Sequence, residues 1–164
     1  MIIVSNTTPF RYLIEIEAIE ILTALFGQVI IPSAVAEELQ HPKTPTKIKT
    51  WIQAPPGWVE IRQADLSLFT PLRSLGRGET EAISLALELK AEAILMDERT
   101  GSREAMRVGL LVLPTLTILE TASAKGLLDL PEAIDRLSKT SFRASPKLLR
   151  EVLERACQVN KLKE

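Results

Sequence analysis

Acidic side chains recur in this chain at the places where a parallel sheet would bring them together. Asp97 and Glu98 directly follow the apolar run 93–96, and Asn6 follows the apolar run 2–4. In an open parallel sheet, ligands bind beyond the carboxyl ends of the strands. Oxygen donors of this kind suit Mg²⁺, Mn²⁺ or Ca²⁺. The sequence therefore indicates a metal site at that edge of a sheet.

Two predicted helices carry further candidates. Glu37 and Glu38 lie on a helix expected over residues 33–40, and Glu79 and Glu81 lie in the first turn of a helix expected over 79–90. Each candidate also has an ordinary structural explanation, because a helix dipole favours acids in its first turn and exposed acidic pairs are common. An aspartate that closes a strand, such as Asp97, can also cap the following turn. These acidic residues taken together indicate a functional site more strongly than any one of them does alone.

The amino-acid composition excludes several other kinds of site. Cys157 is the only cysteine and His41 the only histidine, so an intramolecular disulfide, a cysteine-based zinc site and a multi-histidine metal site are all excluded. The formal net charge is −1, so any support for nucleic-acid binding has to be local.

One basic stripe offers such local support. Arg99, Arg103 and Arg107 recur every four residues and would share one face of a helix. A solvated helix face explains the same spacing. Weaker basic candidates lie elsewhere: Arg73, Arg77, Lys43, Lys47 and Lys49.

Apolar runs and helical periodicities alternate along the chain. We expect strands near 2–4, 29–31, 58–61, 93–96 and 110–113, and helices near 9–14, 16–26, 33–40, 46–52, 79–90, 102–108, 115–124, 131–139 and 146–159, with a loop and a short helix over 62–75. This alternation predicts an α/β fold with a parallel sheet. The length of 164 residues and the 46% hydrophobic content fit one globular domain. Neither a membrane-spanning run nor a signal peptide is apparent, so we expect a cytoplasmic protein.

Four segments resemble, in order, the four motifs of the PIN-domain family. They are VSNTTP at 4–9, IPSAVAEEL at 31–39, GRGETEAISLA at 76–86 and ILMDER at 94–99. The similarity is greatest to stand-alone prokaryotic PIN proteins related to toxin ribonucleases. It implies a three-layer α/β/α sandwich with a central parallel sheet and extra C-terminal helices. We expect residues 1–164 to form a single domain with a core at about 2–125 and a helical extension at about 130–160.

The resemblance also implies a set of site residues. Glu38, Glu79 and Asp97 match the family's catalytic acids, Glu98 assists them, and Glu37 and Glu81 are shifted alternatives. Asn6 stands where the family has its first aspartate, so it offers a neutral oxygen in place of a charged one, and an asparagine there can also cap a helix. The expected metal ligands are Asn6, Glu38, Glu79, Asp97 and Glu98. The expected substrate-binding residues are Thr7, Arg99 and Arg103.

The function implied is an Mg²⁺- or Mn²⁺-dependent endoribonuclease, with the toxin of a toxin–antitoxin pair as the nearest comparison. An antitoxin-like protein and a second copy of the chain are then the expected partners, beside RNA. An apolar stripe at Leu148, Leu149, Val152 and Leu153 either packs on the domain or docks such a partner.

Two alternatives stay open. The first is a catalytically weakened PIN-like module that binds RNA or protein, which Asn6 favours. The second is a nucleotide-binding or receiver-like protein, which is less well supported because the chain has no glycine-rich phosphate loop.

Overall fold

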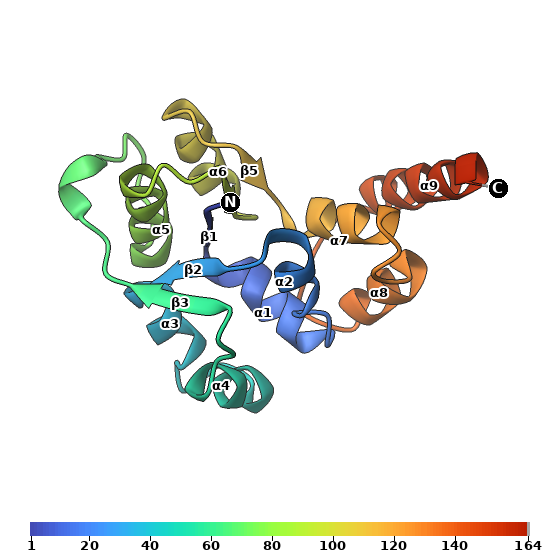
Figure 1. Cartoon of the computed structure of the whole chain (residues 1–164), viewed down its shortest axis with the longest axis horizontal. Coiled ribbons are helices and arrows are strands. Elements are labelled where there is room, and N and C mark those ends of the chain that lie inside the picture. The colour runs from blue at the N-terminus through green and yellow to red at the C-terminus, as the bar shows by residue number, and fades with distance from the viewer. Residues whose placement is uncertain (164) are drawn as a thin grey trace.

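The computed structural model describes residues 1–163 and shows a five-stranded sheet flanked by helices (Figure 1). The strands are β1 (Ile3–Ser5), β2 (Val29–Pro32), β3 (Val59–Arg62), β4 (Ala93–Leu95) and β5 (Val112–Leu113). The helices are α1 (Thr7–Glu15), α2 (Ile21–Phe26), α3 (Ser33–Leu39), α4 (Thr46–Gln53), α5 (Arg77–Glu88), α6 (Arg99–Arg107), α7 (Thr115–Ala124), α8 (Leu130–Ser138) and α9 (Pro146–Lys163). A short 3₁₀ helix, η1 (Leu66–Leu68), lies in the segment predicted to be a loop with a short helix.

All of the strand pairs are parallel, and the strand order is β3-β2-β1-β4-β5. Strand β1 lies at the centre, with Val4 paired to Ile30 on one side and to Ile94 on the other. The chain order reverses at β1, which makes its carboxyl end a switch point where ligands of such sheets bind. The predicted parallel α/β sandwich is therefore confirmed.

Alternate residues of the central strands face opposite layers, as the two-residue repeat of a strand requires. Val4, Ile30 and Ile94 pack with α5 and α6 in one apolar cluster. The residues next to them in the chain, such as Ile3, Ile31 and Leu95, pack with α1, α3 and α7 in the other. Both faces of the central strands are covered, which explains why β2 and β4 are apolar throughout, whereas the edge strand β3 includes Glu60 and Arg62.

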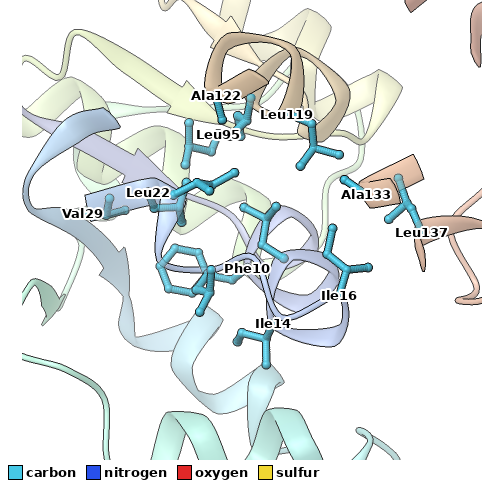
Figure 2. Packing of buried hydrophobic residues seen from close by; sticks show 14 of the residues in the cluster. Phe10, Ile14, Ile16, Leu22, Val29, Leu95, Leu119, Ala122, Ala133 and Leu137 are labelled. Carbon is cyan, nitrogen blue, oxygen red and sulfur yellow. The ribbon is translucent and has the colours of Figure 1, made fainter. Parts of the chain in front are cut away.

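Helix α1 carries the centre of the larger cluster. Figure 2 shows Phe10 and Ile14 of α1 among side chains from the sheet and from α2, α7 and α8. The Phe10 ring meets Trp51 of α4 edge-on, with ring centroids 5.8 Å apart. This packing fixes α1, and with it the polar residues of its first turn.

The prediction of one helix over residues 16–26 was wrong, because only residues 21–26 of this segment are helical. Helix α1 runs to Glu15, and α2 begins only at Ile21. Between them Glu17 has a φ of 59°, a left-handed conformation that a continuing helix does not allow. The apolar residues Ile16 and Ile19 are buried, but they lie in a turn.

The C-terminal helices share the larger cluster. Leu130, Ile134 and Leu137 of α8 and Val152 of α9 are buried in it. Leu148 is 40% exposed, so the apolar stripe on α9 packs only in part. A single domain over the whole chain stays a prediction that this shared core supports. Within the described residues, no helix is both long and apolar enough to cross a membrane.

Candidate functional site

A pocket opens at the carboxyl ends of β1 and β4. The Asn6 backbone N–H donates to the Leu95 carbonyl at 2.9 Å, so the two strand ends lie side by side. The pocket has a volume of about 170 Å³. We call it the carboxylate pocket; its lining residues are Asn6, Thr7, Thr8, Arg11, Tyr12, Glu38, Gly76, Gly78, Glu79 and Glu98.

Asn6 lies at the base of this pocket and is only 2% exposed. It occupies the N-cap position of α1, but its side chain makes no capping hydrogen bond, contrary to one expectation. Instead Nδ2 donates to Glu98 Oε2 at 2.9 Å. Its Oδ1 is buried without a hydrogen-bond partner, which is costly for a polar atom unless a ligand supplies one.

Two threonines of α1 hold two of the carboxylates. The Thr7 hydroxyl donates to Glu38 and the Thr8 hydroxyl donates to Glu98. Glu38 comes from α3 and Glu98 from the N-cap of α6. The first turn of α1 therefore orients acidic side chains from two other elements.

Glu79, in the first turn of α5, is the third carboxylate of the pocket. Burial raises the pKa of Glu79, and the negative charges of Glu98 and Glu38 raise it further, against a backbone hydrogen bond from Gly76. Three acids thus lie close enough to repel one another. A bound cation would remove that repulsion.

Two glycines leave room for these carboxylates. A Cβ on Gly78 would lie 2.5 Å from Glu38 Oε1, and a Cβ on Gly101 would lie 2.5 Å from Glu79 Oε2. Real Cβ contacts do not come so close, so any side chain there would displace the acid. Small residues at 78 and 101 are a requirement of the pocket.

Glu37 and Glu81, the alternative catalytic acids of the sequence analysis, form hydrogen bonds and ion pairs outside the carboxylate pocket. Glu81 is 7% exposed and accepts hydrogen bonds from the Ala34 backbone N–H at 3.2 Å and from Arg77 at 2.9 Å. Glu37 pairs with the other side of Arg77 at 2.5 Å. These contacts join the start of α3 to α5 and so set the spacing of Glu38 and Glu79.

Asp97 does not line the carboxylate pocket. Its Oδ1 accepts from the Thr115 backbone N–H at 2.9 Å, and its Oδ2 accepts from the Thr115 hydroxyl at 2.5 Å. Oδ1 therefore caps the start of α7, and Oδ2 holds the side chain of its first residue. Burial raises the pKa of Asp97, the Thr115 hydrogen bonds oppose this, and the neighbouring charge of Glu98 adds to it.

The three arginines of the predicted stripe on α6 differ in their contacts. Arg107 is committed to Glu104 at 2.7 Å and to the Thr70 carbonyl at 3.3 Å. Arg99 and Arg103 are exposed and have no ion-pair partner among the described residues. Neither of them lines the carboxylate pocket.

The donor set of the pocket fits a divalent cation in its chemistry. It consists of oxygens: the carboxylates of Glu38 and Glu98, the carboxylate of Glu79 that both of them repel, and the unpartnered amide oxygen of Asn6. Across residues 1–163, however, no three acidic, histidine or cysteine side chains are already drawn together around one point. Binding would therefore require Glu38, Glu79 and Glu98 to move toward a common centre.

A family model described as a PIN domain matches residues 2–158. The chain belongs to the PIN-domain family. The resemblance seen in the four motifs is thus confirmed, and the fold is that of a nuclease family. PIN domains in general depend on divalent metals and bind RNA. No curated protein matches the chain.

Sequence reasoning passed over five lining residues: Thr8, Arg11, Tyr12, Gly76 and Gly78. Thr8 is adjacent to Thr7, and the hydroxyl pair at the start of a helix was a signal that both contact the site. Arg11 follows Thr7 by one helical turn and shares its face, a spacing that was visible in the sequence.

Proposed function

We propose that this PIN domain is an Mg²⁺- or Mn²⁺-dependent ribonuclease that cleaves RNA phosphodiesters at the carboxylate pocket. The observation that supports it best is the lining itself: Asn6, Glu38, Glu79 and Glu98 converge from four elements at the carboxyl edge of the sheet. The buried, unpartnered Oδ1 of Asn6 adds a donor at the base. A toxin role with an antitoxin-like partner, and a homodimer, remain proposals that rest on the family resemblance.

The chain's own residues would perform three tasks. Glu38, Glu79 and Glu98 would hold the ion, with Asn6 as a neutral ligand. Thr7 and Thr8 keep two of those carboxylates oriented. When bound, such an ion lowers the pKa of a coordinated water and neutralises charge on the scissile phosphate.

The sequence suggested Asp97 as the main metal ligand and Glu98 as an assisting residue, and the contacts of the two side chains favour the reverse. We propose Glu98 as the ligand, because Thr8 and Asn6 aim it into the pocket. Asp97 as a ligand stays a prediction, and its two contacts with Thr115 favour a capping role.

Cleavage of a labelled single-stranded RNA separates these roles. We expect cleavage with Mg²⁺ or Mn²⁺ that EDTA abolishes. The cleavage rate should fall at least about 100-fold in Glu98→Gln and in Glu79→Gln, because each of these glutamates is proposed to bind the metal. Asp97→Asn should keep most of the activity, because both oxygens of Asp97 contact Thr115. Full loss of activity in a folded Asp97→Asn, with Glu98→Gln still active, would reverse the assignment.

A second candidate function is a binding module without catalysis. It is favoured by Asn6, since an amide that donates to Glu98 leaves the pocket with one negative charge fewer than an aspartate would. If the wild type does not cleave RNA, Asn6→Asp should raise Mn²⁺ affinity. An unchanged Mn²⁺ affinity in Asn6→Asp would argue against a weakened metal site.

A further inference from the structure

Arg11 is the one basic side chain among the described residues that line the carboxylate pocket. It projects from α1 one turn beyond Thr7 and Thr8, the residues that hold Glu38 and Glu98. Helix α1 is fixed by the buried faces of Phe10 and Leu13 on either side of Arg11 in the chain. The guanidinium is therefore carried by a rigid element.

The guanidinium carbon of Arg11 lies 5.9 Å from the ring centroid of Tyr12, but the side chain lacks the acidic partner that its surroundings lead one to expect. Among the described residues it forms no ion pair, although three carboxylates line the same pocket. Its Nε is buried without a hydrogen-bond acceptor. Buried donors in native proteins are nearly always paired, so this side chain has hydrogen-bonding capacity that a bound anion can satisfy.

We propose that Arg11 binds a phosphate of the RNA substrate at the carboxylate pocket. This inference rests on the proposed function, and it adds the residue that receives the substrate's charge. A polyanion approaching three carboxylates is repelled unless positive charge compensates on the same side. An arginine suits this task because its planar fork donates two parallel hydrogen bonds to phosphate oxygens.

Arg11 differs in this respect from the arginines predicted to bind substrate. Arg99 and Arg103 are exposed on α6 and lie outside the pocket lining. They can contact only flanking phosphates, if any. Arg11 lies beside the candidate metal ligands and would contact the phosphate nearest to the reaction.

One competing explanation is structural. Glu15 lies four residues after Arg11 on α1, and its Oε2 is also buried without a partner. A rotation of both side chains would pair them along the helix. In that case Arg11 would stabilise α1 and would have no part in substrate binding.

Binding and cleavage of a fluorescein-labelled oligouridylate distinguish the two. The variants are Arg11→Gln, Arg11→Lys, Glu15→Gln and, as a matched exposed control on α9, Arg150→Gln. RNA affinity is measured in Ca²⁺ over a range of salt concentrations, and Mn²⁺ affinity is measured without RNA. Cleavage is followed in Mn²⁺.

We expect Arg11→Gln to weaken RNA binding about tenfold and to reduce the slope of log affinity against log salt by about one, because one phosphate contact is lost. Arg11→Lys should restore part of the affinity, since it keeps the charge but not the fork. Mn²⁺ affinity should not fall in either variant. Glu15→Gln and Arg150→Gln should bind and cleave like the wild type.

Two results would overturn the proposal. One is wild-type RNA affinity and salt slope in Arg11→Gln. The other is an equal loss in Glu15→Gln, which would show that the pair acts through the helix. If the wild type binds RNA but cleaves none, the proposed function fails, while the Arg11 inference is still decided by the binding and salt data alone.

Discussion

At the scale of single residues, the site depends on which of two adjacent acids enters the pocket. Asp97 and Glu98 follow β4 after one intervening residue, Met96, and successive side chains of an extended chain point in opposite directions. Sequence spacing predicted the pair but not its orientation. The contacts of Asp97 with Thr115 and of Glu98 with Asn6 separate them, and neither contact was predictable because each joins residues far apart in the chain.

Gly78 offers a test of the room that the pocket needs. In Gly78→Ala the new methyl group must displace Glu38, whose carboxylate supplies the three atoms nearest to it. The end of a glutamate moves easily, and alanine favours a helix over glycine by up to about 1 kcal/mol, so stability should hold or rise. Mn²⁺ affinity should fall about tenfold, as when a supporting contact of a ligand is lost.

Calorimetric titration with Mn²⁺ checks this expectation. Gly57→Ala is the control, since a Cβ there meets nothing within 4 Å. Wild-type Mn²⁺ affinity in Gly78→Ala would mean that Glu38 is not a ligand.

Glu79 offers a test of the repulsion between the acids. Its raised pKa means that the folded chain holds this proton at a pH where the unfolded chain has released it. Ionised Glu79 therefore destabilises the metal-free fold near neutral pH, and Glu79→Gln should raise its melting temperature. As the pH falls through the raised pKa, the wild-type residue becomes protonated and the advantage of the variant should vanish.

Thermal unfolding in EDTA over a pH series measures this difference. Added Mn²⁺ should stabilise the wild type, because a ligand that binds only the folded state raises its stability, and should stabilise Glu79→Gln much less. A variant that is less stable than the wild type at neutral pH in EDTA would contradict the account.

At the scale of elements, α1, α3, α5 and α6 each supply one part of the site, and their mutual contacts set its shape. The existence of these helices could be predicted from periodicity and from glycine and proline positions. Their contacts could not, because Glu81 and Glu104 look like ordinary helical acids in the sequence. In the structure both are buried and accept backbone hydrogen bonds from another segment.

Glu104 is the residue that ties α6 to the loop before α5. It is 4% exposed and accepts from the backbone N–H groups of Leu72 and Arg73 and from Arg107. Glu104→Ala removes the acceptor of these hydrogen bonds and should lower the free energy of unfolding. Chemical denaturation measures this, with the exposed Glu92→Ala as the control. Equal stability of the two variants would show that the loop does not depend on Glu104.

At the scale of the whole molecule, the fold brings distant segments to one edge of a parallel sheet. Alternating strands and helices predicted that sheet, and a parallel sheet predicts a site at its carboxyl edge. The family motifs named most of the lining residues. Arg11 was missed because an arginine on an amphipathic helix is usually solvated, and its spacing from Thr7 fits a solvated residue as well as one that lines the pocket.

The central claim is that a divalent cation binds among Asn6, Glu38, Glu79 and Glu98. The most direct test is anomalous diffraction at the manganese absorption edge, from crystals grown with Mn²⁺. We predict a peak in the carboxylate pocket, within bonding distance of Asn6 Oδ1 and of carboxylate oxygens from at least two of the three glutamates. A peak bound by Asp97 away from these residues, or none in the pocket at saturating Mn²⁺, would contradict the account.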